Sequence, residues 1–111
     1  MEIENQYPIG KMEKVDFSVD AKNGFLNDIQ FLPNALEAAL SNLDEEQLQT
    51  PYREGGWTVH QLVHHIADSH MNAYERFKLG FTEDTPTIKP YNEAAWAELA
   101  DVKELPVNIS V

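Results

Sequence analysis

Apolar residues recur at steps of three and four along two long stretches of the chain, and this spacing predicts two amphipathic α-helices. The first stretch predicts a helix over residues 18–43, after an extended lead-in over residues 1–17. Pro33 lies inside this helix and lacks a backbone donor, so we expect a kink there or a late start of the regular helix. The apolar stripe comprises Phe25, Ile29, Leu32, Leu36, Ala39, Leu40 and Leu43.

The second stretch predicts a helix over residues 58–81. Thr58 is a favourable N-cap, and Gln61 stands at the position that completes a capping box. Asp44 and Gln47 predict a similar box at the start of a short helical turn that ends at Leu48, before a loop marked by Thr50-Pro51 and Gly55-Gly56. The apolar stripe of the second helix comprises Val59, Val63, Ile66, His70, Ala73, Tyr74, Phe77 and Phe81.

The remainder of the chain predicts shorter elements. A loop over residues 85–90 contains two prolines, Asn92 can cap a short helix over residues 93–102, and Pro106 ends it. Ser110 resembles the cap of a further helix. Two amphipathic helices leave two apolar stripes that need partners. The pattern therefore predicts an all-α protein, and a four-helix bundle that is truncated or completed by another chain is favoured over a core covered by the short helix and loops alone.

Composition narrows the functional classes. The chain has 111 residues, no cysteine and a net charge of −11. This length predicts one domain over residues 1–111. The charge argues against nucleic acid and anionic membranes as partners. No window approaches the ~18 apolar residues of a membrane span. The polar N-terminal residues lack the apolar core of a signal peptide, so we expect a cytoplasmic protein.

All four histidines lie between Gly55 and His70, and their directions on a helical wheel differ. With Val59 at zero, His70 falls near ~20°, inside the apolar stripe, and is interpreted as a core histidine. His60 and His64 share a face at ~100–140°, where an i, i+4 pair could chelate a metal; a solvated face is the favoured interpretation. His65 lies near ~240° in a polar strip with Gln61, Ser69 and Asn72, as in a pocket between helices.

The motifs of this chain resemble those of the DinB superfamily, specifically its YfiT-like branch of metal-dependent hydrolases, which includes bacillithiol S-transferases. The resemblance rests on motifs distributed over the whole sequence, which are Tyr7-Pro8-Ile9-Gly10, Thr50-Pro51-Tyr52-Arg53, Gly55-Gly56-Trp57-Thr58-Val59, His64-His65-Ile66-Ala67-Asp68-Ser69-His70-Met71-Asn72, Arg76-Phe77-Lys78-Leu79, Thr82-Glu83-Asp84-Thr85-Pro86, Lys89-Pro90-Tyr91 and Trp96.

The resemblance implies an up-and-down four-helix bundle, often dimeric, of which this chain supplies the first two long helices plus short helices. It also implies a divalent metal (nickel, zinc or iron) held by three histidines. One ligand is the histidine eight residues after the tryptophan, here His65, and the other two form an HxxxH pair on the fourth helix. No such pair follows His65 in this sequence, so the metal could be absent from this chain.

Two kinds of function follow from these expectations. The first is a metal-dependent hydrolase or thiol S-transferase with a small-molecule substrate, incomplete as this chain. His65 is then a metal ligand, the catalytic residues are unknown, and no cofactor other than the metal is implied. The second is a non-catalytic helical fragment or small-ligand-binding bundle, stabilised as a homodimer or higher oligomer that covers the apolar stripes.

Overall fold

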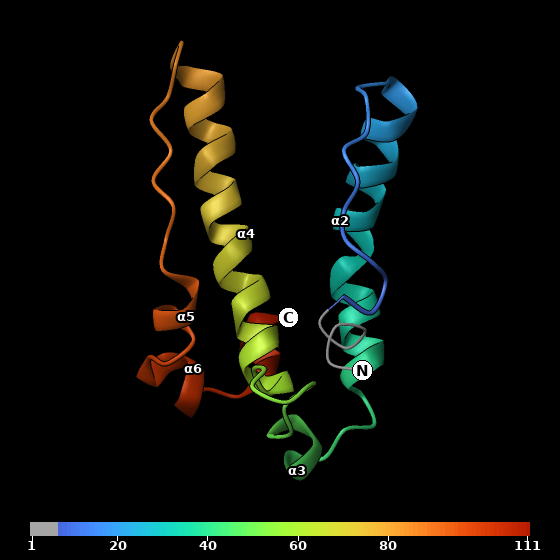
Figure 1. The fold of residues 1–111 in the computed structure, drawn as a ribbon, viewed down its shortest axis with the longest axis vertical. Coiled ribbons are helices and arrows are strands. Elements are labelled where there is room, and N and C mark those ends of the chain that lie inside the picture. Colours follow the sequence, from blue (N-terminus) through green and yellow to red (C-terminus); the bar gives the residue numbers. More distant parts are fainter. Residues whose placement is uncertain (1–6) are drawn as a thin grey trace. The chain divides into compact units, whose positions relative to one another are not determined.

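The computed structural model describes residues 7–111, in which the regular elements are all helices and no β-strand is present (Figure 1). The first six residues of the predicted lead-in lie outside the described part. The contacts divide the chain into two compact units, with the boundary between Gly56 and Trp57. The all-α prediction is confirmed, whereas the prediction of a single domain stays a prediction.

The first unit contains α2 (Val19–Leu40) and the short α3 (Glu45–Leu48). Ser18 caps α2, its hydroxyl accepting a hydrogen bond from the amide of Ala21 at 3.0 Å. The helix continues through Pro33, so the expected late start is wrong. The predicted capping box of α3 is confirmed: Asp44 accepts from the amide of Gln47 at 2.8 Å, and the Gln47 side chain accepts from the amide of Asp44 at 2.9 Å.

The second unit is built on α4 (Val59–Thr82), which begins at the predicted capping box. The Thr58 hydroxyl accepts from the amide of Gln61 at 3.0 Å, and the Gln61 side-chain oxygen accepts from the amide of Thr58 at 3.1 Å. These bonds satisfy donors that the first helical turn leaves free. The sequence therefore determines where α4 begins, and with it the direction of every side chain that follows.

The segment after α4 turns back along the helix and ends in three short elements (Figure 1). These are α5 (Glu93–Trp96), α6 (Ala100–Glu104) and a 3₁₀ helix, η1 (Val107–Ser110). The prediction of one helix over residues 93–102 is wrong, because a new helical start at Ala100 follows the turn at residues 97–99. Asn92 does cap α5, accepting from the amide of Ala95 at 3.1 Å.

The core of the second unit lies between the first half of α4 and the short elements, since α6 and η1 both pack against α4. Val63 of α4 and Val102 of α6 are each 2% exposed, and Ala97 after α5 is equally buried. No helix in the described part of the chain is long and apolar enough to cross a membrane.

Candidate functional site

One face of α4 carries His65, Ser69, Asn72 and Arg76, spaced so that all four lie along one line of the helix. The first three are half-buried and Arg76 is exposed. The expected polar strip beside His65 is therefore present. The segment that returns along α4 brings Tyr91 against the same face.

His65 contacts two aromatic residues. Its imidazole packs against the indole of Trp57 with ring centroids 4.7 Å apart, and its Nδ1 lies 3.4 Å from the hydroxyl of Tyr91. A neutral imidazole can accept the phenol proton at Nδ1 or donate an Nδ1 proton to the phenol oxygen. Only the second arrangement leaves a lone pair at Nε2 for a metal ion.

Tyr91 joins the polar strip to the returning segment. Burial raises the pKa of its phenol, and the negative charges of Glu93 and Asp68 act in the same direction. A hydrogen bond with Ser69 and the positive charge of Arg76 act in the opposite direction. The phenol is therefore uncharged at neutral pH and can serve as donor or acceptor. Its ring also meets Trp96 edge-on, with centroids 4.7 Å apart.

The interpretation of His60 and His64 as a solvated pair is wrong. They are 7% and 4% exposed, because α6 and η1 cover this face of α4. His60 Nε2 lies 2.6 Å from the Val102 carbonyl oxygen, and His64 Nε2 lies 2.9 Å from that of Leu105. A carbonyl oxygen only accepts, so each Nε2 carries a proton. Both imidazoles are therefore hydrogen-bonded to backbone carbonyl groups, and their Nε2 atoms are not available to a metal ion.

Gln61, the residue after His60, contributes to the same arrangement. Besides capping α4, its side-chain amide donates to the carbonyl oxygen of Ala97 at 3.1 Å and to the Glu98 carboxylate at 3.2 Å. The first two turns of α4 thus satisfy carbonyl groups at the ends of α5 and α6, which have no partner within their own helices.

The interpretation of His70 as a core histidine is also wrong, since its side chain is exposed. The apolar stripe continues past it on the exposed half of α4, where Tyr74 and Phe77 are 63% and 62% exposed. The wheel placed His70 in the stripe correctly, but this part of the stripe is exposed.

Asp68 lies one turn after His64 on α4 and is buried, at 8% exposure. Burial raises the pKa of its carboxyl group, and the negative charge of Asp101 raises it further. His64 and His65 act in the opposite direction with a smaller effect than burial. The charged form of Asp68 therefore destabilises the fold.

Asp68→Asn should raise the free energy of unfolding at neutral pH. The folded-state pKa lies above the ordinary value of 3.8, so the folded protein binds the proton more readily than the unfolded chain. The ionised carboxylate lowers the free energy of unfolding by its whole amount above the folded-state pKa, and this loss is absent below the unfolded-state pKa. Urea unfolding across a pH series should show a higher free energy of unfolding for Asp68→Asn than for the wild type at pH 7, and this difference should vanish in acid. Glu75→Gln, an exposed change on the same helix, is the control; a gain that persists in acid would contradict the assignment.

The described residues do not complete a metal site. No three histidine, cysteine, aspartate or glutamate side chains between residues 7 and 111 gather closely enough to hold an ion. His65 offers one imidazole nitrogen, and the imidazoles of His60 and His64 are engaged elsewhere. Further ligands would have to come from outside this part of the chain.

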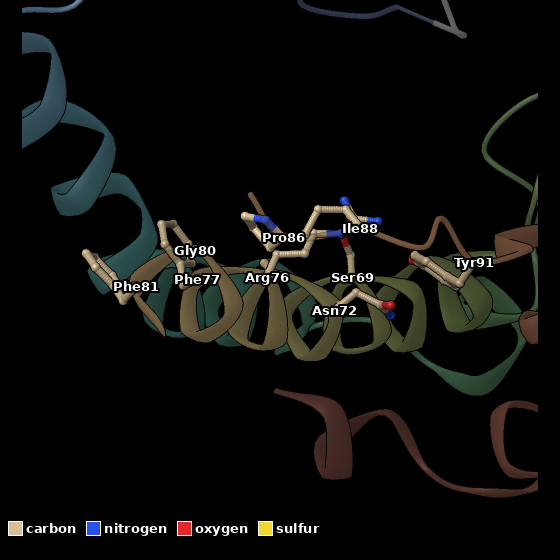
Figure 2. Close-up of a pocket in the computed structure, with 10 residues that line it drawn as sticks. Ser69, Asn72, Arg76, Phe77, Gly80, Phe81, Pro86, Ile88 and Tyr91 are labelled. Atoms are coloured by element: carbon tan, nitrogen blue, oxygen red, sulfur yellow. The ribbon is translucent and has the colours of Figure 1, made fainter. Parts of the chain in front are cut away.

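A groove runs along the second half of α4 (Figure 2), and Tyr91, whose hydroxyl lies 3.4 Å from His65 Nδ1, lines one end of it. Its cavity volume is about 610 Å³. Arg76 and Tyr91 line it and were not among the predicted site residues. The helical wheel contained a signal for Arg76. It lies eleven positions after His65, and at 100° per residue this offset points its side chain within ~20° of the same direction. Nothing comparable places Tyr91, which lies outside the helix in a loop that only the fold positions.

The chain belongs to the DinB superfamily, whose sequence pattern matches residues 29–105. This confirms the resemblance of the sequence motifs. A Bacillus mycoides (strain KBAB4) protein named "Putative metal-dependent hydrolase" is 53% identical over 107 residues, and a Bacillus cereus (strain B4264) protein with the same name is equally similar. Each match covers 96% of this chain and 61% of the relative, so the chain spans about three fifths of these relatives.

A solved structure shares the fold. YfiT from Bacillus subtilis, described as "a probable metal-dependent hydrolase with an unusual four-helix bundle topology", matches with a TM-score of 0.91 and 46% identity. The match covers 96% of this chain and 62% of YfiT. The two long helices α2 and α4 are therefore the part of a four-helix bundle topology that this chain supplies, as the motifs predicted.

Proposed function

We propose that this chain is part of a metal-dependent hydrolase of the YfiT-like type, in which His65 is one metal ligand. The observation that carries the proposal is the environment of His65, which is half-buried, oriented through Nδ1 by Tyr91 and adjacent to the groove. The names of the similar Bacillus proteins support the same kind of chemistry. The metal, whether nickel, zinc or iron, would supply a Lewis acid.

The remaining ligands belong to this proposal as well, and they would come from outside the described residues. An imidazole from another chain is one such source. Thiol S-transfer is the alternative chemistry for the same site, and an assay that supplies a thiol and an electrophile would separate it from hydrolysis. A non-catalytic fragment or ligand-binding bundle is the outcome if no metal binds at His65.

A homodimer or higher oligomer in the cytoplasm is part of the proposal. Apolar side chains remain about half exposed on α2, where Phe25, Ile29 and Phe31 are 48%, 51% and 51% exposed. Patches of this kind are typical of surfaces that meet a partner. Light scattering coupled to size-exclusion chromatography should give at least twice the 12.6 kDa mass of one chain. A monomer at all concentrations would contradict this part of the proposal.

Titration with Ni²⁺ tests the role of His65. Paramagnetic broadening of backbone amide signals should begin around His65 and Tyr91, and His65→Ala should abolish it while His70→Ala does not. Metal content measured by mass spectrometry on the same proteins should fall in His65→Ala alone. Broadening or metal content unchanged in His65→Ala would remove the basis for the hydrolase proposal.

A further inference from the structure

The groove along α4 has an ordered distribution of polar and apolar residues. It lies between the helix and residues 86–91, and Figure 2 shows Tyr91 near one end and Phe81 at the other. Along α4, Ser69 and Phe81 are twelve residues apart, which corresponds to ~18 Å of helix. The lining residues are Ser69, Asn72, Ala73, Arg76, Phe77, Gly80, Phe81, Pro86, Ile88 and Tyr91.

The two ends of the groove differ in chemistry. The end next to His65 presents the hydroxyls of Ser69 and Tyr91 and the amide of Asn72. The other end presents Phe77, Phe81 and the ring of Pro86. A few polar groups beside a mainly apolar wall are typical of sites for small molecules.

Arg76 lies between these ends and is the only charged side chain among the described residues that line the groove. The one ion pair within residues 7–111 joins Lys103 and Glu98, so Arg76 has no carboxylate partner there. A neighbouring cavity of about 540 Å³ shares Arg76 and adds Glu75 and Lys89, whose opposite charges balance. The guanidinium thus gives the groove a single uncompensated positive charge in a protein whose net charge is −11.

We propose that this groove binds a small organic carboxylate with an apolar body. The guanidinium of Arg76 matches a carboxylate with two parallel N–H donors. The apolar body lies against Phe77, Phe81 and Pro86, and a further polar group of the ligand reaches Ser69, Asn72 and Tyr91. The assignment of this ligand as a substrate rests on the proposed function, whereas its binding to the groove does not.

The test uses two probes of nearly equal shape on the full chain. 4-Phenylbutyrate carries the carboxylate, and 4-phenylbutyramide is its neutral counterpart. Titrations followed by amide chemical shifts should show the largest changes at Ser69, Asn72, Ile88 and Tyr91. The carboxylate should bind at least about tenfold more tightly than the amide, since charge-assisted hydrogen bonds exceed neutral ones by that amount.

Two variants assign the preference to Arg76. Arg76→Met should bring the affinities of the two probes to within about twofold, because the methionine keeps an apolar stem without the charge. Lys78→Met removes one positive charge from the same helix outside the groove and should preserve the tenfold preference. Both positions are exposed, so both variants should keep the wild-type circular dichroism spectrum.

Three results of the wild-type titrations would overturn the proposal: no binding of either probe, equal binding of the two probes, or chemical shift changes centred on α2. Loss of the preference for the carboxylate in Lys78→Met would overturn it as well. Groove signals that change with protein concentration alone would mean that a second copy occupies the groove. The two proposals fail separately. Metal binding that persists in His65→Ala would contradict the role of His65 and leave the groove proposal standing. Absence of carboxylate binding in a wild type that still binds metal through His65 would contradict the groove proposal alone.

Discussion

Replacing His64 with alanine should lower the free energy of unfolding by about 3 kcal/mol. The side chain is 4% exposed and joins α4 to the C-terminal end of the chain through two hydrogen bonds. Its Nε2 donates to the carbonyl oxygen of Leu105 at 2.9 Å, and its Nδ1 accepts from the hydroxyl of Ser110 at 2.6 Å. Alanine removes both bonds and leaves a space next to a carbonyl that water reaches poorly.

His64→Gln tests which of the two bonds matters. The glutamine amide can replace the Nε2 donor but not the Nδ1 acceptor, so we expect about half of the loss to be recovered. Urea unfolding followed by tryptophan fluorescence reports on the second unit, residues 57–111, because both tryptophans of the chain, Trp57 and Trp96, lie in it. His70→Ala, an exposed change on the same helix, should cost less than about 0.5 kcal/mol. Equal effects of the two alanine variants would show that His64 does not hold the C-terminal segment.

Val102→Asp should abolish the folding of residues 57–111, with an expected cost of about 4 kcal/mol. Val102 is 2% exposed and lies in α6, which packs against α4. An aspartate there would place a carboxylate in the core, and small units have little stability to lose.

The matched control for this change is Ile109→Asp, because Ile109 lies in η1 and is 60% exposed. It should leave the tryptophan fluorescence and the urea midpoint almost unchanged. Circular dichroism of Val102→Asp should retain part of its helical signal if α2 and α3 fold as the separate unit that the contacts define. A midpoint for Val102→Asp close to that of the wild type would contradict the position of the core.

The sequence by itself determined the local features of this protein. Helix starts at Thr58, Asp44 and Asn92 depend on side chains that bond to amides three residues away, and each was predictable for that reason. The polar strip of His65, Ser69 and Asn72 was equally predictable, because helix geometry alone sets the directions of its members.

Only the tertiary structure decided which faces of α4 are covered. A helical wheel gives the direction of His64 or Asp68 around the axis, but it contains no information on what lies opposite. The segment after α4 folds back over that face, which buries His60, His64 and Asp68, while His70 in the apolar stripe stays exposed. Tyr91 reaches His65 across 26 positions of the sequence for the same reason. Contacts of this kind depend on the path of the returning chain, which no local pattern specifies.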